Sequence, residues 1–177
     1  MNTENESIYF YDETGEKSKK ENMFLNNFDP AEFVADDNFK YITSEHYYQA
    51  HKFSGYEEPE FKEYFKEVRS QENPLKSKKL ARTYQKLPKF NNEKWENDKV
   101  TVMKKALIYK FSQNKDLLEK LLSTGTATLR EESKRDLFWG GLLEGSKNML
   151  GNLLGELRDN YKKEGKVFIE GSGLEKI

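Results

Sequence analysis

The chain contains no cysteine, and this absence excludes several kinds of chemistry. Without thiols there is no disulfide framework, no zinc or iron–sulfur site with cysteine ligands, and no cysteine nucleophile. Histidine is almost as scarce, because 177 residues contain only His46 and His51, which leaves little for a metal site or a Ser-His-Asp triad. We therefore expect no metal and no cofactor, and look for chemistry in carboxylates, amines and aromatic rings.

Long apolar segments are also missing. The polar residues 1–7 are followed by no apolar stretch typical of a secretory signal, and no run approaches the ~18 apolar residues of a membrane span. Together with the lack of cysteine, this predicts an intracellular, soluble protein of the cytoplasm with no membrane partner. Aromatic residues make up 14% of the chain, which is typical of a folded core rather than a disordered chain.

The net charge of −1 conceals two regions of opposite charge. Residues 1–61 contain 5 basic and 14 acidic side chains, whereas residues 76–110 contain 11 basic and 3 acidic ones. A local basic block on a nearly neutral protein favours a phosphate-bearing ligand over long duplex DNA, which usually binds a strongly basic domain. A solvated, lysine-rich helix face explains the same block equally well.

Hydrophobic periodicity predicts an α+β fold, a mainly helical single domain over residues 1–177 with a small β-sheet. Strands are expected at 8–11, at 33–35 and 39–42 around an Asp36-Asp37-Asn38 turn, and at 166–170. Helices are expected at about 45–53, 61–68, 74–84, 98–112, 115–124 and 147–164. The expected N-caps are Thr43 or Ser44, Asn73, Asn97 or Asp98, Asn114 and Ser146, and Gly165 is the expected C-terminal stop.

The segment from Ser44 to Phe53 places three polar side chains on one helix face. Glu45, Gln49 and Lys52 are spaced at i, i+4 and i+7, and Tyr48 lies beside them. A carboxylate, an amide and an amine in one line are suited to acid–base or nucleophilic chemistry. A solvated face with a weak salt bridge has the same spacing.

Two glycine-containing segments are candidates for a ligand pocket. In residues 136–141, Asp136 is followed by two aromatic residues and two glycines, which suits close approach of backbone N–H groups to an anion. In residues 145–151, a glycine precedes a helix N-terminus, where phosphate can bind. A turn with one core tryptophan and an ordinarily capped helix are the simpler alternatives, and Trp95 is typical of a core residue.

The order and spacing of these segments resemble the NADAR family, also called YbiA-like, over residues 8–162. The most diagnostic segment, Ser44–Phe53, is similar to the family pattern S-E-H-Y-x-Q-A-x-K-F. The matching segments, in family order, are Leu25–Pro30, Ser44–Phe53, Leu80–Arg82, Trp95, Lys99–Phe111, Leu121–Gly125, Leu129–Glu131, Asp136–Gly140, Gly145–Gly151 and Leu153–Arg158. The chain departs from the pattern at Asn26 and Ala81, in a loop between Gly140 and Asn148 that is one residue shorter, and in a C-terminal extension at 163–177.

The resemblance implies a YbiA-like fold and a hydrolase acting on N-glycosyl compounds, which cleaves the bond between ribose C1 and an exocyclic amine. Family members are associated with ADP-ribosyl-guanine in nucleic acid and with phosphoribosylamino-pyrimidine intermediates of riboflavin biosynthesis. We favour ADP-ribosyl-guanine, because a chain with no companion synthase domain suits a repair or antitoxin role. The expected partners are an ADP-ribosyl or phosphoribosyl substrate and the nucleic acid that carries it.

The resemblance also implies roles for individual residues. Glu45 would move protons at the sugar or the departing nitrogen, and Asp136 would orient ribose hydroxyls or share proton transfer. Lys52 would act as a Schiff-base nucleophile, with Lys40 as the alternative amine. Base stacking, phosphate pairing and hydrogen bonding to the sugar would involve Asn27, Phe28, Lys40, Tyr48, Gln49, Arg82, Trp95, Trp139, Gly140 and Asn148. Two other functions remain open, namely a non-catalytic NAD or ADP-ribose binding module and a helical protein that binds an acidic partner through residues 76–110.

Overall fold

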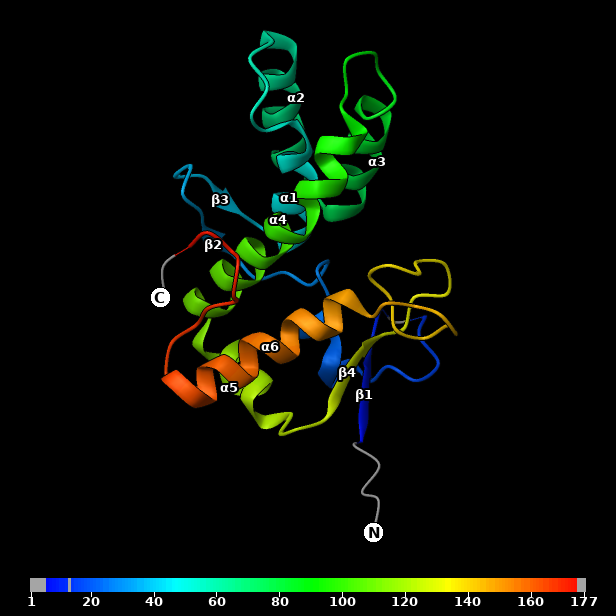
Figure 1. Ribbon diagram of the computed structural model, residues 1–177, viewed down its shortest axis with the longest axis vertical. Coiled ribbons are helices and arrows are strands. Elements are labelled where there is room, and N and C mark those ends of the chain that lie inside the picture. Colours follow the sequence, from blue (N-terminus) through cyan, green and yellow to red (C-terminus); the bar gives the residue numbers. More distant parts are fainter. Residues whose placement is uncertain (1–5, 13, 175–177) are drawn as a thin grey trace. The chain divides into compact units, whose positions relative to one another are not determined.

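The computed structural model describes residues 6–12 and 14–174 (Figure 1). The described residues form two compact units. The first unit takes residues 6–29 and 114–169, and the second unit takes residues 30–113 and 170–174. The fold is mainly helical with little β-structure, which confirms the predicted α+β class. Among the described residues, no helix is both long and apolar enough to cross a membrane.

The first unit is built on two parallel strands, β1 and β4, which run side by side in Figure 1. Ile8 of β1 lies opposite Leu129 of β4. Helix α6 packs on β4, and α5 packs on α6. The elements are β1 (Ser7–Phe10), the 3₁₀ helix η1 (Lys20–Leu25), α5 (Lys115–Ser123), β4 (Thr128–Glu131) and α6 (Met149–Glu164).

Gly151 sets how closely α6 approaches β4. A Cβ atom at this position would lie 2.0 Å from the carbonyl oxygen of Leu129, so only glycine fits. The apolar side of α6 is buried through Leu150, Leu153, Leu154 and Leu157. The helix ends at Gly165, whose φ of +68° confirms the predicted stop.

The second unit arranges three helices around the short helix α1. Strands β2 and β3 pair antiparallel, with Asn38 at a φ of +57° in the turn, as the Asp-Asp-Asn sequence predicts. Helix α1 packs against α2, α3 and α4. The elements are β2 (Phe33–Val34), β3 (Lys40–Tyr41), α1 (Ser44–Ala50), the 3₁₀ helix η2 (His51–Phe53), α2 (Pro59–Arg69), α3 (Pro74–Tyr84) and α4 (Asn92–Gln113).

Both histidines are structural parts of this second unit. The Nδ1 and Nε2 atoms of His46 lie 2.8 Å from the Thr43 hydroxyl and 3.0 Å from the Gln71 carbonyl oxygen. The ring of His51 stacks on Tyr47 at 3.7 Å, and its Nδ1 contacts the Tyr47 carbonyl oxygen. Burial lowers the pKa of each imidazole, which favours the neutral ring.

Two predicted helix starts are wrong. Helix α4 begins at Asn92, not after Asn97 or Asp98, because Trp95 is buried and the turn around it is helical. The side chain of Asn91 accepts a hydrogen bond from the Lys94 N–H at 2.9 Å and caps this turn. Helix α6 begins at Met149, after Asn148 in the left-handed region, and not at Ser146.

Two strand assignments also change. Residues 166–170 were expected to form a strand, but they form none, although Val167, Phe168 and Ile169 are buried. No apolar pattern predicts a strand at 128–131, where only Leu129 is fully apolar. That segment is β4 because β1, over a hundred residues earlier, supplies its hydrogen-bonding partner.

Replacing Gly151 by alanine should destabilise the protein, because the new Cβ collides with the Leu129 carbonyl. We expect G151A to lower the free energy of unfolding by more than about 2 kcal/mol. Gly155, one turn later on α6, is the matched control, since a Cβ there would meet nothing closer than the Arg158 guanidinium at 3.8 Å. G155A should be stabilising by about 0.5–1 kcal/mol. Equal effects in urea denaturation would contradict the close approach.

The observed start of α4 gives a second prediction. Asn91→Ala should cost about 1 kcal/mol of unfolding free energy, because the Lys94 N–H loses its cap. Asn97→Ala should change the stability by less than about 0.5 kcal/mol or increase it, since Asn97 is exposed within the helix. Thermal unfolding of both variants would show the reverse order if the helix began at residue 98.

Candidate active site

The amine of Lys52 is buried in the second unit, where η2 follows α1. The Lys52 residue is 8% exposed, and its Nζ donates a hydrogen bond of 3.0 Å to the Gln85 side-chain oxygen. The Nζ atom also lies 5.9 Å from the ring centre of Tyr48 and 5.6 Å from that of Trp95. The two rings meet edge to face at 5.0 Å. These aromatic faces stabilise the ammonium form in place of water.

The pKa of Lys52 is lowered from 10.5 to about 8, mainly because burial removes water from the charged amine. The Glu45 carboxylate raises this pKa, but its effect is smaller than that of burial. The positive charges of Arg82 and Lys78 lower it further. About one amine in ten is therefore neutral at pH 7, which is the form that attacks carbon.

Glu45 and Gln49 form a buried pair on α1, one turn apart as the sequence predicts. The Gln49 amide donates a hydrogen bond of 2.6 Å to Glu45 Oε1, and both side chains are at least 95% buried. The Thr43 side chain accepts a hydrogen bond from the His46 N–H and caps α1, which fixes where the helix begins and so where Glu45 lies on it. The Gln49 Oε1 atom is buried without a hydrogen-bond partner, so it offers an acceptor for a hydroxyl of a ligand.

The two other predicted cations of this unit lie at the surface. Arg82 on α3 is exposed and acts electrostatically on Lys52, so its guanidinium is available to an anion near that amine. Lys40 is exposed as well, and it forms an ion pair with Glu32 at 2.7 Å. Lys52 is therefore buried among aromatic and charged groups, the surroundings that a nucleophilic amine needs, whereas Lys40 is not.

In the first unit, Asp136 organises a turn. Its Oδ1 accepts hydrogen bonds from the N–H groups of Phe138, at 2.9 Å, and Trp139, at 2.8 Å. Gly140 is required in this turn, because a Cβ there would lie 2.5 Å from the Asp136 carbonyl oxygen. Trp139 is half-buried and contacts Phe138 edge to face at 5.0 Å. One of the two carboxylate oxygens of Asp136 therefore holds this turn in place.

The start of α6 is hydrogen-bonded to the same turn. The N–H groups of residues 147–150 donate to the carbonyl oxygens of residues 137–140, at 2.8–3.3 Å. These donors were candidates for binding a phosphate, but the carbonyls already occupy them. These N–H groups are therefore not free to bind a phosphate, and backbone hydrogen bonds rather than an ordinary side-chain cap hold the helix start.

Asn148 joins this helix start to β4. Its Nδ2 donates 2.8 Å to the Leu129 carbonyl oxygen, while its Oδ1 is buried without a hydrogen-bond partner. A Cβ on Gly141 would lie 2.1 Å from that Oδ1, so glycine leaves room for it. Earlier in the unit, Asn27 is buried and the Phe28 N–H donates to Asn26 Oδ1 at 3.0 Å.

The structure thus gathers one group of predicted site residues within the second unit. This group consists of Glu45, Tyr48, Gln49, Lys52, Arg82 and Trp95. Sequence analysis missed Gln85 and Lys78, which contact or act on the Lys52 amine from α3 and its C-cap. No spacing rule links them to Lys52, so the sequence carried no signal for them. Within the part of the chain that is described, no cluster of three His, Asp or Glu side chains has the arrangement of a metal site.

The lowered pKa of Lys52 predicts how stability varies with pH. Between pH 8 and pH 10.5 the unfolded chain binds more protons than the folded one at this residue, so stability rises with pH. The free energy of unfolding of the wild type, relative to Lys52→Met, should increase by about 3 kcal/mol from pH 7 to pH 10.5. A flat difference over this pH range would contradict the buried amine.

Known proteins show what this arrangement is similar to. The family model described as NADAR domain matches residues 9–162. The chain is 41% identical over 140 residues to the riboflavin biosynthesis protein PYRR of Zea mays, covering 76% of this chain and 22% of that protein. It is 39% identical over 123 residues to the N-glycosidase YbiA of Escherichia coli, covering 69% of this chain and 71% of that protein.

The likeness extends to three dimensions. The NMR structure of Escherichia coli YbiA superposes with a TM-score of 0.72 at 32% sequence identity, covering 91% of this chain and 88% of the other. The chain spans about a fifth of the length of the plant relatives that it matches. The match of the family model over most of the chain, together with these identities, shows that this protein belongs to the NADAR family.

Proposed function

We propose that this protein is an N-glycosidase that hydrolyses the bond between ribose C1 and an exocyclic amine. The observation that carries the proposal is the buried Lys52 amine, with its pKa near 8, in the electrostatic field of Glu45. A partly neutral amine that feels the charge of a buried carboxylate is suited to covalent catalysis with proton transfer. The names of two relatives, N-glycosidase YbiA and riboflavin biosynthesis protein PYRR, support this class of reaction.

The proposed reaction uses the open-chain form of a ribosylamine. When the sugar ring opens, the bond between C1 and the exocyclic nitrogen becomes an imine. The neutral Lys52 amine adds to C1, the bond from C1 to the exocyclic nitrogen breaks, and the departing amine takes up a proton that Glu45 relays. Water then adds to the lysine imine at C1, which releases the ribose aldehyde and returns the Lys52 amine. The sum is one water consumed for one C–N bond cleaved.

Other side chains of the second unit supply binding rather than bond cleavage. The unpartnered Gln49 oxygen accepts a hydrogen bond from a ribose hydroxyl, and the exposed Arg82 guanidinium pairs with a phosphate. Lys78 adds positive charge on the same side of α3, since both act on Lys52. Each of the two candidate substrates bears phosphate on its ribose, so both use these contacts.

Two substrates fit the proposal. The names of the plant relatives and of a Vibrio vulnificus riboflavin biosynthesis protein, 32% identical over 163 residues, favour a phosphoribosylamino-pyrimidine. The lysine-rich helices of the second unit favour ADP-ribosyl-guanine in nucleic acid, the substrate that the sequence analysis preferred. Assaying phosphoribosylamino-uracil and ADP-ribosylated single-stranded DNA side by side separates the two.

Variants at Glu45 and Lys52 test the activity. With whichever substrate is hydrolysed, Glu45→Gln and Lys52→Met should each lower kcat/KM by about 10²–10⁴-fold, because each removes a group that acts on the reacting atoms. Lys40→Met is the matched control and should stay within about 2-fold of the wild type. Loss of activity in Lys40→Met, with Lys52→Met active, would overturn the assignment. Tight ligand binding without turnover in the wild type would instead indicate a binding module.

A further inference from the structure

The side-chain amide of Gln85 meets the Lys52 amine at the point where helix α3 ends. Gln85 is the C-cap residue of α3, and it is half-buried. Its Oε1 lies 3.0 Å from Lys52 Nζ and accepts a hydrogen bond from it. The proposed reaction gives this amide no task, although the amide contacts the amine that reacts.

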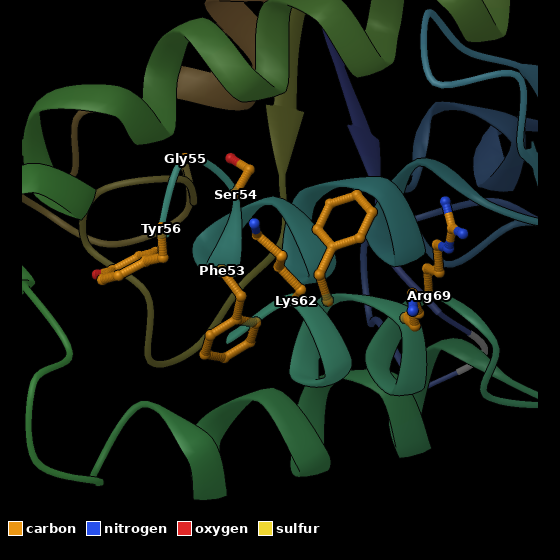
Figure 2. Close-up of a pocket in the computed structure, with 8 residues that line it drawn as sticks. Phe53, Ser54, Gly55, Tyr56, Lys62 and Arg69 are labelled. Carbon is orange, nitrogen blue, oxygen red and sulfur yellow. The ribbon is translucent and has the colours of Figure 1, made fainter. Parts of the chain in front are cut away.

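An aromatic contact holds the two partners of this hydrogen bond in place. Phe53 directly follows Lys52, and Figure 2 shows its ring pointing to the opposite side of the chain from Ser54. Tyr84 directly precedes Gln85. The rings of Phe53 and Tyr84 meet edge to face, with their centres 6.0 Å apart. The end of η2 therefore packs against the end of α3 next to the hydrogen bond.

Helix α2 fixes the same aromatic cluster from another direction. The Tyr84 ring stacks on Tyr64 at 4.1 Å, and the Tyr84 hydroxyl donates a hydrogen bond to the Glu67 carboxylate. The Phe53 ring also contacts Tyr64, with 6.0 Å between the ring centres. One cluster thus joins η2, α2 and α3, so the Gln85 amide meets the amine from a rigid support.

A neutral acceptor suits an amine that has to lose a proton before it reacts. The ammonium form of lysine has three N–H donors, whereas the neutral amine keeps two N–H groups and one lone pair. When Gln85 accepts from one N–H, the amine cannot rotate freely about its Cε–Nζ bond, and the lone pair takes one of two remaining positions. A carboxylate in place of the amide would also hold the amine, but its charge would favour the ammonium form more strongly.

We propose that Gln85 is a positioning residue, which directs the lone pair of Lys52 toward ribose C1 by accepting a hydrogen bond from the amine. This inference rests on the proposed function, in which the Lys52 amine adds to C1. Gln85 acts through Lys52 and leaves substrate binding to other side chains. Its loss should therefore change kcat more than KM.

Two variants of Gln85 should move the pKa of Lys52 in opposite directions. Gln85→Met removes the acceptor and should lower this pKa by about one pH unit, whereas Gln85→Glu should raise it by about one pH unit or more. NMR titration of the full chain labelled with ¹³C at lysine Cε measures the pKa, and the Lys52 signal is the one absent from Lys52→Met. Thr83→Glu adds the same charge at an exposed position of α3, and as the matched control it should shift the pKa less than half as much.

Kinetics with the substrate that the wild type hydrolyses test whether the contact positions the amine. At high pH the limiting kcat of Gln85→Met should be about ten-fold lower or less, with KM within about two-fold of the wild type, although its amine is more often neutral. Gln85→Glu should lose about ten-fold in kcat/KM at pH 7 and recover most of it above its raised pKa.

The titration and the kinetics can each overturn the proposal. An unchanged limiting kcat in Gln85→Met would do so, because the amine would then react without its acceptor. Equal pKa changes in Gln85→Glu and Thr83→Glu would also do so, because charge anywhere on α3 would then have the same effect. No turnover by the wild type would overturn the proposed function and the positioning role with it, whereas the titration would still report whether the amide holds the amine.

Discussion

Burying the amine of Lys52 costs free energy, and the second unit offsets that cost with one hydrogen bond and two aromatic rings. The cost is not fully offset, which is why the pKa of the amine falls to about 8. Helices α1, α3 and α4 each contribute a group to this environment, through Tyr48, the Gln85 C-cap and Trp95. The way these helices pack therefore also determines how readily the Lys52 amine loses its proton.

In the first unit, hydrogen bonds join a turn to the start of α6, so the N–H groups at that helix start are occupied. Asp136 accepts from the N–H groups of its own turn, and the carbonyls of that turn accept from the start of α6. Glu132 holds another loop in the same way, because its buried carboxylate accepts hydrogen bonds from the N–H groups of residues 16–18. These contacts leave the Asn148 oxygen as a buried, unpartnered acceptor beside Gly141. A hydroxyl donor would satisfy it.

Local signals predicted those parts of the fold that depend on local contacts. The Asp-Asp-Asn turn, the Asn73 cap of α3 and the Gly165 stop of α6 follow from side-chain chemistry within four residues. Strand β4 escaped prediction because its partner is far away in the chain. The start of α4 was misplaced because residues 91–98 contain several good caps, and only the burial of Trp95 selects Asn91. In the site, the i, i+4, i+7 spacing found Glu45, Gln49 and Lys52, whereas Gln85 depends on helix packing.

Reductive trapping tests the central claim, that Lys52 is the reacting amine, most directly. The protein is incubated with its substrate and borohydride, digested, and mapped by mass spectrometry. We expect a ribosyl adduct on Lys52 that is absent in Lys52→Met and present in Lys40→Met. An adduct on another lysine would contradict the claim, and so would the absence of any adduct under conditions in which the wild type turns over substrate.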